Sequence, residues 1–228
     1  SPINQIKLTP DIDKNTVEAI VTAEEFCPGD ELAFSVFYQG KLVKQVTASA
    51  DWYRTSVLIA LQPDDFIDEI HYWTPEHPNL YNMQVRLLRG GAVQDTVDTY
   101  FGMRKISIDQ GRILLNNAPY YLKMVLDQGY WKETGLTAPD DDALRYDVEI
   151  AKACGFNGVR KHQKIEDPRY YYWADKLGLL VWGEVPSAYE YCDQEIINIS
   201  REFQDFMVRD YNHPCLIAWV PLNESWGV

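Results

Sequence analysis

The sequence predicts a multidomain protein in which an all-β sandwich is followed by an α/β unit that forms half of a barrel. Three observations predict this. Short runs of alternating apolar and polar residues fill the part of the chain before about residue 103. From about residue 119, apolar runs alternate with helical patterns, which is typical of βαβ units and a parallel sheet. Glycine, proline and aspartate clusters separate these runs by short loops.

Residues 1–103 carry the first pattern. Apolar residues alternate with polar ones over 17–21 and 32–38, and comparable runs follow at 43–48, 55–61, 81–88 and 93–101. About seven short strands at this spacing predict a β-sandwich of immunoglobulin type. No pair of cysteines brackets a core tryptophan, so an antibody-like domain is excluded.

Residues 104–118 are expected to connect the two parts. The segment from Ile106 to Pro119 contains Asn116-Asn117, a dipeptide that favours a tight turn. We predict a hairpin that lies across the bottom of the barrel.

Residues 119–228 carry the second pattern. The predicted strands are Tyr120–Val125, Gly158–Arg160, Leu179–Trp182 and Leu216–Val220. Four strands with three intervening helices correspond to the first half of a (β/α)8 barrel, known as a TIM barrel.

Start and stop signals delimit the three helices. Asp140–Asp142 offers N-caps for the first helix, which ends at Gly155, and Asp167-Pro168 opens the second, which ends at Gly178. The apolar positions expected to face the core are, in chain order, Leu144, Val148, Ala151, Tyr170, Trp173, Ala174, Leu177, Ile196, Ile199, Phe203, Phe206 and Met207.

Charge and composition limit the partners. The 228 residues carry a formal net charge of −13, which argues against nucleic acid and against an anionic membrane surface, because both need lysines and arginines. No stretch approaches the roughly 20 apolar residues of a membrane span. The chain opens on Ser1 rather than Met, so we expect a piece of a longer protein, and its compartment is left open.

No metal or cofactor is predicted. The imaginable set His162, Glu166 and Glu184 lacks a local ligand spacing. The cysteines also lack such spacing and are expected to be buried free thiols: Cys27, Cys154, Cys192 and Cys215.

Polar and aromatic groups gather where the four predicted parallel strands end. Because a barrel directs these ends to one mouth, we expect them to line one concavity. A mixture of acids, bases and indoles suits a neutral polyhydroxylated ligand. The candidates are Asp127, Gln128, Tyr130 and Trp131; Arg160, Lys161, His162, Lys164 and Glu166; Trp182, Glu184, Ser187 and Tyr189; and Asn223, Glu224 and Trp226.

Glu224 is the predicted catalytic acid. A glycosidase acid needs a carboxyl whose pKa is raised by apolar walls and a nearby carboxylate. Trp219, Leu222 and Trp226 would form the walls. Asn223 could bond a sugar 2-hydroxyl, a contact that strengthens in the transition state.

Several candidates have structural alternatives. Core packing explains Trp182 and Trp219 at least as well as ligand contact, and His162 could be a satisfied histidine at a strand end. Arg160 could serve to hold Glu184 or Glu224 by a charge-assisted bond. His213, in Asn212-His213-Pro214, is expected to be a turn residue.

Five motifs resemble one family, glycoside hydrolase family 2, which holds β-galactosidases, β-glucuronidases and β-mannosidases. They occur in the family's order over nearly the whole chain. They are Trp73–Tyr81 (WTPEHPNLY), Phe101–Arg104 (FGMR), Gly155–Arg160 (GFNGVR), Asp175–Trp182 (DKLGLLVW) and the stretch from Asn212-His213-Pro214 to Asn223-Glu224.

The resemblance implies a retaining exo-β-glycosidase, similar to β-galactosidases, in which Glu224 is the acid/base. It implies substrate contacts by Asn223, Asp127, Arg160, His162, Trp182, Glu184 and Trp226. The family's nucleophile would lie beyond Val228, and its N-terminal sugar-binding-like domain would precede Ser1, so this chain alone is expected to be inactive.

The chain departs from well-known members of the family at two places. Residues 125–131 lack the histidine that many members carry, and His162 stands one position earlier than their histidine. These departures bear on the sugar rather than on the reaction class.

The main alternative function is a carbohydrate-binding or adhesive module without chemistry, motivated by the sandwich and the aromatic loops. A further expectation concerns assembly. Half a barrel leaves two open strand edges, at Tyr120–Val125 and Leu216–Val220, so two copies are expected to pair through them. A clean monomer in light scattering would count against such pairing.

Overall fold

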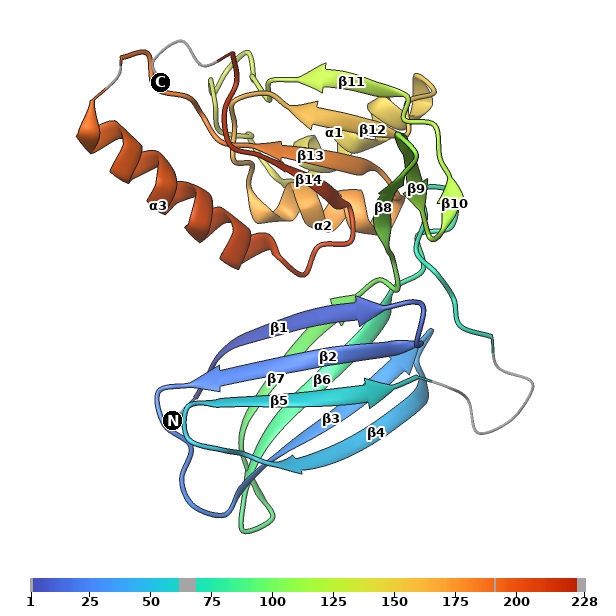
Figure 1. The fold of residues 1–228 in the computed structure, drawn as a ribbon, viewed down its shortest axis with the longest axis vertical. Helices are drawn as coiled ribbons and strands as arrows, with labels where there is room; N and C mark the ends of the chain where they lie inside the picture. The colour runs from blue at the N-terminus through green and yellow to red at the C-terminus, as the bar shows by residue number, and fades with distance from the viewer. Residues whose placement is uncertain (1, 62–68, 191, 225–228) are drawn as a thin grey trace. The chain divides into compact units, whose positions relative to one another are not determined.

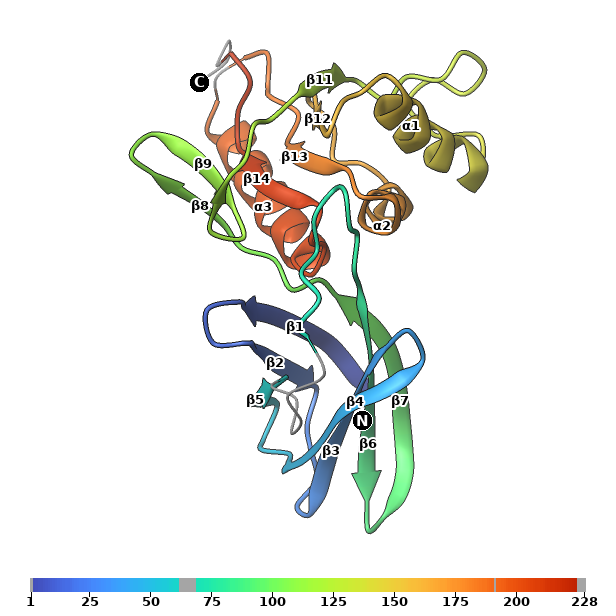
Figure 2. The same cartoon turned by 90° about the vertical axis from the view of Figure 1, so that its right-hand side faces the viewer.

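A computed structural model describes residues 2–61, 69–190 and 192–224 of the chain (Figures 1 and 2). The chain divides into two compact units. Unit 1 comprises Ser1–Trp73, Asn79–Asp109 and Leu114–Ala118, and unit 2 comprises Thr74–Pro78, Gln110–Ile113 and Pro119–Val228. Each unit is described by itself below.

Unit 1 is an antiparallel sandwich, which confirms the predicted all-β immunoglobulin-like part. One sheet has the order β1-β2-β5 and the other β4-β3-β6-β7. The strands are β1 (Ile3–Asp11), β2 (Thr16–Ala23), β3 (Asp30–Tyr38), β4 (Lys41–Ser49), β5 (Arg54–Ala60), β6 (Tyr81–Arg89) and β7 (Ala92–Phe101). Alternate residues of each sheet fill one core, as the period of two requires; examples are Val17, Val21, Phe34, Ile59 and Val85.

Strand β1 was not among the strands predicted from the sequence. It is nine residues long and contains Pro10, which cannot donate a backbone hydrogen bond to a ladder. The strand pairs with β2 alone and lies at the edge of its sheet, where such a proline is tolerated. Its weak burial pattern, with Leu8 as the one fully buried side chain, explains why the alternation signal was missing.

The connecting segment is a three-stranded meander rather than a single hairpin. Its strands are β8 (Ile106–Asp109), β9 (Arg112–Leu115) and β10 (Ala118–Pro119), in the order β10-β9-β8. The predicted turn at Asn116-Asn117 joins β9 to β10, and both residues have positive φ, at 51° and 66°. The extra turn, at Gln110-Gly111, has the same left-handed backbone and was not predicted.

Unit 2 contains the predicted parallel sheet. Its strands are β11 (Met124–Asp127), β12 (Gly158–Lys161), β13 (Leu180–Glu184) and β14 (Leu216–Val220), and they pair in sequence order. All four point the same way in Figure 1. β11 and β14 are the outer strands, and the pairing of two copies through them stays a prediction.

The first strand of this sheet begins later than predicted. Residues 120–123 precede β11 instead of forming it, because the side chain of Asn157 bonds their backbone. Its Oδ1 accepts from Lys123 N at 2.7 Å, and its Nδ2 donates to Tyr121 O at 2.8 Å. A side chain thus replaces the strand ladder over this stretch.

The helices are α1 (Asp141–Ala153), α2 (Pro168–Leu177) and α3 (Asp193–Asp210). The predicted caps are present: Asp140 accepts from Ala143 N, Asp167 accepts from Arg169 N, and Gly178 has the left-handed φ of 80°. The helices connect parallel neighbouring strands and lie on one face of the sheet (Figure 2), as the usual right-handed crossover requires. No helix in the described ranges is long and apolar enough to cross a membrane.

The expectation of four buried thiols is wrong in part. All four cysteines are free, but only Cys215 is fully buried, and Cys27 is partly buried. Cys154 and Cys192 are exposed because they stand at helix ends, as the C-cap of α1 and the N-cap of α3.

Candidate active site

The register of the parallel sheet separates two faces. Arg160, Trp182 and Ala218 are partners across β12, β13 and β14, so their side chains point to the same face. The next row, with Lys161, Gly183 and Trp219, points to the opposite face, where the helices pack. We call the face that carries Arg160 the inner face, because it corresponds to the interior of a barrel.

Arg160 connects two candidate site residues on the inner face. Its Nε donates to Glu184 Oε2 at 2.6 Å, and its Nη2 donates to Asn223 Oδ1 at 2.5 Å. Glu184 is fully buried, and Asn223 is 6% exposed. The predicted Arg160–Glu184 bond therefore exists, and the same guanidinium also fixes the orientation of the Asn223 carboxamide.

Two further residues complete the network, and the sequence did not single out their bonds. Gln163 N donates to Glu184 Oε1 at 2.9 Å. Ser187 Oγ accepts from Asn223 N at 2.9 Å and lies 3.2 Å from Asn223 O. Both residues follow strand ends, the signal that placed Ser187 among the predicted candidates and that could also have identified Gln163.

Glu224 follows this anchored Asn223 directly. Glu224 is exposed, and its backbone has a φ of 53°. The left-handed region is costly for a residue with a side chain, and such outliers concentrate at functional sites. The Arg160 and Ser187 bonds to Asn223 hold the segment that presents Glu224 at the carboxyl end of β14.

The structure describes one of the two tryptophans predicted around Glu224, and it does not lie beside the acid. Trp219 lies on the helix face, with its ring 4.8 Å from that of Phe206 in α3, so the expectation that it walls the acid is wrong. The reason is the register with β13: Trp219 stands opposite Gly183, in the row of the sheet that points to the helices. Gly183 next to it leaves room for Phe206, since a Cβ there would come within 2.5 Å of that ring. Trp226 lies outside the described residues.

Trp182 and His162 lie at the inner face and at the end of β12, respectively. Trp182 is half-buried and stands opposite Arg160, on the inner face. His162 N donates to Asp127 O at 2.8 Å, and its ring Nδ1 lies 3.4 Å from Gln128 Nε2. The ring is thus directed toward the loop after β11.

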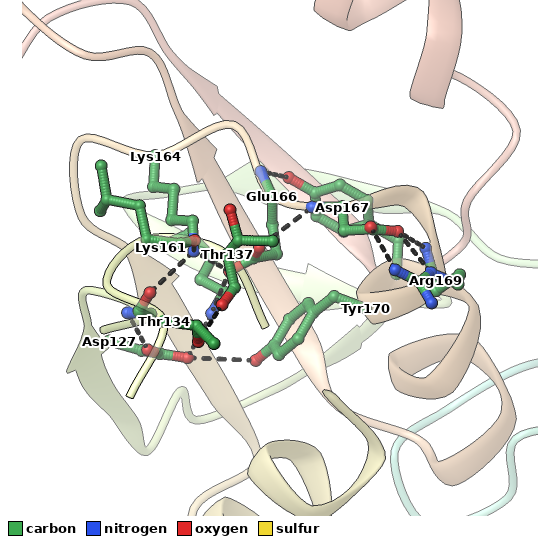
Figure 3. Close-up of polar contacts among 12 residues, drawn as sticks. Asp127, Thr134, Thr137, Lys161, Lys164, Glu166, Asp167, Arg169 and Tyr170 are labelled. Atoms are coloured by element: carbon green, nitrogen blue, oxygen red, sulfur yellow. Dashed lines mark hydrogen bonds and ion pairs between the residues drawn. The ribbon is translucent and has the colours of Figure 1, made fainter. Parts of the chain in front are cut away.

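Asp127 takes part in a second polar cluster, which Figure 3 shows. Its Oδ2 accepts from Lys161 Nζ at 2.7 Å and lies 3.4 Å from the hydroxyl of Tyr170. Lys161 is fully buried, bonds Glu166 at 2.9 Å and lies over the Tyr170 ring. Buried charges need such partners, so this cluster fastens the ends of β11 and β12 to α2.

The loop after β11 is closed over that cluster. Asp127 Oδ1 accepts from Gly129 N at 2.8 Å, and Lys164 Nζ donates to Gly129 O at 2.7 Å. Gly129 has a φ of 62°, and a Cβ there would lie 2.7 Å from Glu166 Oε2, so another residue would strain the backbone and displace the Glu166 carboxylate. Neighbouring Asp147 of α1 has its pKa raised to about 6, by burial first and then by the charge of Asp127.

The metal alternative is not supported by where its members lie. Glu184 bonds Arg160, whereas Glu166 bonds Lys161 on the helix side. Within the described ranges, one group of three potential ligand atoms lies within 4.8 Å of one another, formed by Asp175, His213 and Cys215. Each already bonds protein groups: Asp175 Oδ2 is 2.5 Å from His213 Nδ1, its Oδ1 accepts from Cys215 N, and Cys215 Sγ is 3.6 Å from Tyr171 O.

This second group joins the start of β14 to α2. His213 does stand in a turn, as predicted, and its ring additionally pairs with Asp175, which is fully buried. Burial and, more weakly, the charge of Arg209 lower the pKa of His213. The charge of Asp175, its hydrogen bond to the ring and the charge of Asp210 raise the pKa by more, so that the net shift is upward.

We expect His213→Asn to destabilise the chain more at pH 6 than at pH 8. The pKa of His213 is higher in the folded chain than in the unfolded chain, where it is about 6.5. The charged ring therefore stabilises the fold fully below that unfolded-state pKa, and this contribution is lost as the pH rises through the folded-state pKa. The loss at pH 6 should be about 1.5–3 kcal/mol, the size of a charge-assisted bond. Thermal unfolding of both proteins at the two pH values measures it, and an equal loss at both would contradict the charged pair.

The inner-face network can bind a polyhydroxylated ligand. A charged guanidinium, a buried carboxylate, two amides and a hydroxyl meet at the carboxyl ends of β12, β13 and β14, next to an exposed carboxylate. Convergent polar groups at this edge of a parallel sheet are the usual setting for a site. Of the predicted residues, the network brings together Arg160, Glu184, Ser187 and Asn223, whereas the carboxylate of Asp127 belongs to the Lys161 cluster.

Comparisons with known proteins agree with this architecture. The sequence model of the family described as "Glycosyl hydrolases family 2" matches residues 1–104, and that described as "Glycosyl hydrolases family 2, TIM barrel domain" matches residues 106–227. Together these two matches extend over almost the entire chain.

Curated relatives include β-galactosidases. That of Thermoanaerobacter pseudethanolicus is 26% identical over 223 residues, which cover 96% of this chain and 29% of that protein. That of Vibrio cholerae is 33% identical over 163 residues, covering 67% of this chain and 16% of that protein. The chain thus spans less than a third of the length of either relative.

Solved structures share the fold. The β-glucuronidase of Bifidobacterium dentium complexed with coumarin-3-O-glucuronide superposes with a TM-score of 0.83 at 20% identity, over 97% of this chain and 38% of that one. The β-glucuronidase of Parabacteroides merdae superposes with a TM-score of 0.78 at 20% identity, over 95% of this chain and 28% of that one.

Proposed function

The chain belongs to glycosyl hydrolases family 2, and from that membership we propose that it supplies the proton donor and part of the sugar site of a retaining exo-β-glycosidase. The observation that carries the proposal is the Arg160–Glu184–Asn223 network, which anchors Asn223-Glu224 at the carboxyl end of β14. The relatives are β-galactosidases and β-glucuronidases, which supports a glycosidase.

In the proposed reaction, Glu224 is the acid/base. Its carboxyl protonates the glycosidic oxygen as the bond to the leaving group breaks, while a second carboxylate attacks the anomeric carbon and forms a covalent glycosyl-enzyme. Glu224 then removes a proton from the water that releases the sugar. We place the second carboxylate on a later barrel strand, because four strands supply half of the eight that close a barrel.

Asn223 and Arg160 position the sugar in this proposal. Arg160 occupies Oδ1 of Asn223, so the amide Nδ2 is the group that Asn223 offers to a sugar hydroxyl. A donor fixed in this way costs little reorganisation when the contact strengthens in the transition state. Trp182, half-buried on the same face, would stack against the ring, while His162 and Trp226 are proposed to complete the pocket.

We propose a neutral galactoside-like sugar rather than a glucuronide. Arg160 is already neutralised by Glu184 at 2.6 Å, so its charge is not available in full to a uronate. A carboxylate on the sugar would also lie near Glu184 and Glu224, and like charges at short range repel.

Assays with nitrophenyl β-glycosides test the proposal. The enzyme that contains this chain should hydrolyse the β-galactoside faster than the β-glucuronide. The 228-residue chain by itself should give no turnover above buffer, because it would carry the proton donor without the nucleophile. Substantial turnover by the pure chain would contradict the placement of the nucleophile, and a preference for the glucuronide would contradict the proposed sugar.

A further inference from the structure

Unit 1 contains a cavity whose lining residues are far in sequence from the proposed catalytic residues. It measures about 530 Å³, within the roughly 300–1,000 Å³ of small-molecule sites. Two loops line it, residues 24–28 between β2 and β3 and residues 50–53 between β4 and β5. Both loops lie at the same end of the sandwich (Figure 1).

The second loop displays two large aromatic side chains. Trp52 is 81% exposed and Tyr53 is 63% exposed, and both line the cavity. They occupy the two central positions of a turn that Arg54 N closes by donating to Asp51 O at 3.2 Å. Trp52 has a φ of 52°, a backbone that glycine or asparagine adopts at lower cost. Neither core packing nor turn formation explains an indole at this position.

The backbone of the aromatic turn is held in place. Trp52 O accepts from Phe26 N at 2.6 Å, and Tyr53 O accepts from Ala23 N at 3.0 Å. Asp51 N donates to Thr55 Oγ1 at 2.8 Å. Phe26 itself is 5% exposed and anchors the first loop in the core. The two aromatic side chains are thus presented from a fixed backbone, which lowers the entropic cost of binding.

The charged groups around the cavity are all acidic. Its charged lining residues are Glu24, Glu25 and Asp51, and no lysine or arginine in the described part of the chain lines it. Carboxylates accept hydrogen bonds from hydroxyls, while a ligand that carries its own carboxylate would be repelled. An apolar platform beside acceptor groups therefore favours a neutral ligand with many hydroxyls.

We propose that this cavity is a binding site for neutral saccharides, separate from the proposed catalytic face. The C–H face of a pyranose ring carries partial positive charge and stacks on the negative face of the Trp52 indole. Ring hydroxyls donate to the carboxylates of the cavity rim. The site discriminates against uronic acids, which lack a cationic partner here, and it binds sugar without transforming it.

The test is a titration of the ¹⁵N-labelled 228-residue chain with lactose, followed through the indole N–H signal of Trp52. That signal is assigned by its loss in Trp52→Ala. It should shift with half-saturation at about 1–10 mM, as expected for an open site with few contacts. Trp52→Ala should weaken the binding measured by calorimetry at least tenfold. The matched control, Tyr121→Ala, removes an aromatic residue of unit 2 that is also 81% exposed and should change nothing.

A second comparison tests the charge argument. Methyl β-glucoside should bind more tightly than methyl β-glucuronide, and Glu24→Gln/Glu25→Gln should reduce that difference. An unmoved Trp52 signal up to the solubility limit of lactose would overturn the proposal. So would lactose binding that is equally strong in a folded Trp52→Ala chain, which would locate the sugar elsewhere, or an equal affinity for the glucuronide.

Discussion

Glu224→Gln is expected to lower kcat/KM of the enzyme that contains this chain by about 10²–10⁴-fold, the range for removing a general acid. The loss should depend on the leaving group. Alkyl alcohols depart poorly without a proton and should show the full loss, whereas nitrophenolate departs without one and should show a smaller loss in the glycosylation step. The physical reason is that a carboxamide at this position cannot donate the proton that the Glu224 carboxyl supplies.

Steady-state kinetics with a series of aryl and alkyl β-galactosides measures this dependence. The logarithm of kcat/KM should fall steeply with leaving-group pKa in Glu224→Gln and shallowly in the unaltered enzyme. A matched control is Glu149→Gln, which removes an exposed carboxylate on α1 and should leave the series unchanged. A uniform loss across the series would show that Glu224 does not protonate the leaving group.

Arg160→Met is expected to destabilise unit 2 by about 3 kcal/mol, near the lower end for breaking a buried ion pair. The variant leaves Glu184 fully buried without its cation and removes the donor to Asn223 Oδ1. The lower end applies because the Arg160 side chain is 33% exposed. Guanidinium unfolding, followed by hydrogen exchange of β12 and β13, measures the change in free energy.

A double variant separates the buried charge from lost packing. Arg160→Met/Glu184→Gln removes both charges and keeps an acceptor for Gln163 N, so it should recover at least half of the loss. Arg145→Met breaks the exposed pair with Glu149 and should cost less than about 0.5 kcal/mol. If Arg160→Met cost no more than Arg145→Met, the network would not organise the inner face.

Local signals explain what the sequence could predict. Asp167-Pro168 and Gly178 delimit α2 through caps that depend on neighbouring residues alone. The four strands of the parallel sheet were found from short apolar runs, and β14 has the predicted bounds. β11 begins later than expected because Asn157, which is 34 positions from Lys123 and 36 from Tyr121, bonds the backbone ahead of it.

The site was harder to predict because its bonds join distant residues. The backbone N–H of Gln163 bonds Glu184, which is 21 positions away, and the backbone N–H of Asn223 bonds Ser187, which is 36 positions away. No spacing rule predicts such pairs. For Trp219 the sequence left core packing and a wall of the site open, because its face depends on the register with β13, which a single strand does not disclose. The bond between Arg160 and Glu184 could be predicted because both side chains stand at the ends of neighbouring strands, where opposite charges pair.

Trapping the glycosyl-enzyme tests the central claim most directly. A 2-deoxy-2-fluoro-β-galactosyl fluoride forms the covalent intermediate without help from an acid, because fluoride leaves unprotonated, and mass spectrometry of peptides locates the label. We predict one labelled carboxylate outside residues 1–228, in the unaltered enzyme and in Glu224→Gln alike. A label on Glu184 or Glu224 would contradict the account, because the chain would then carry the nucleophile itself.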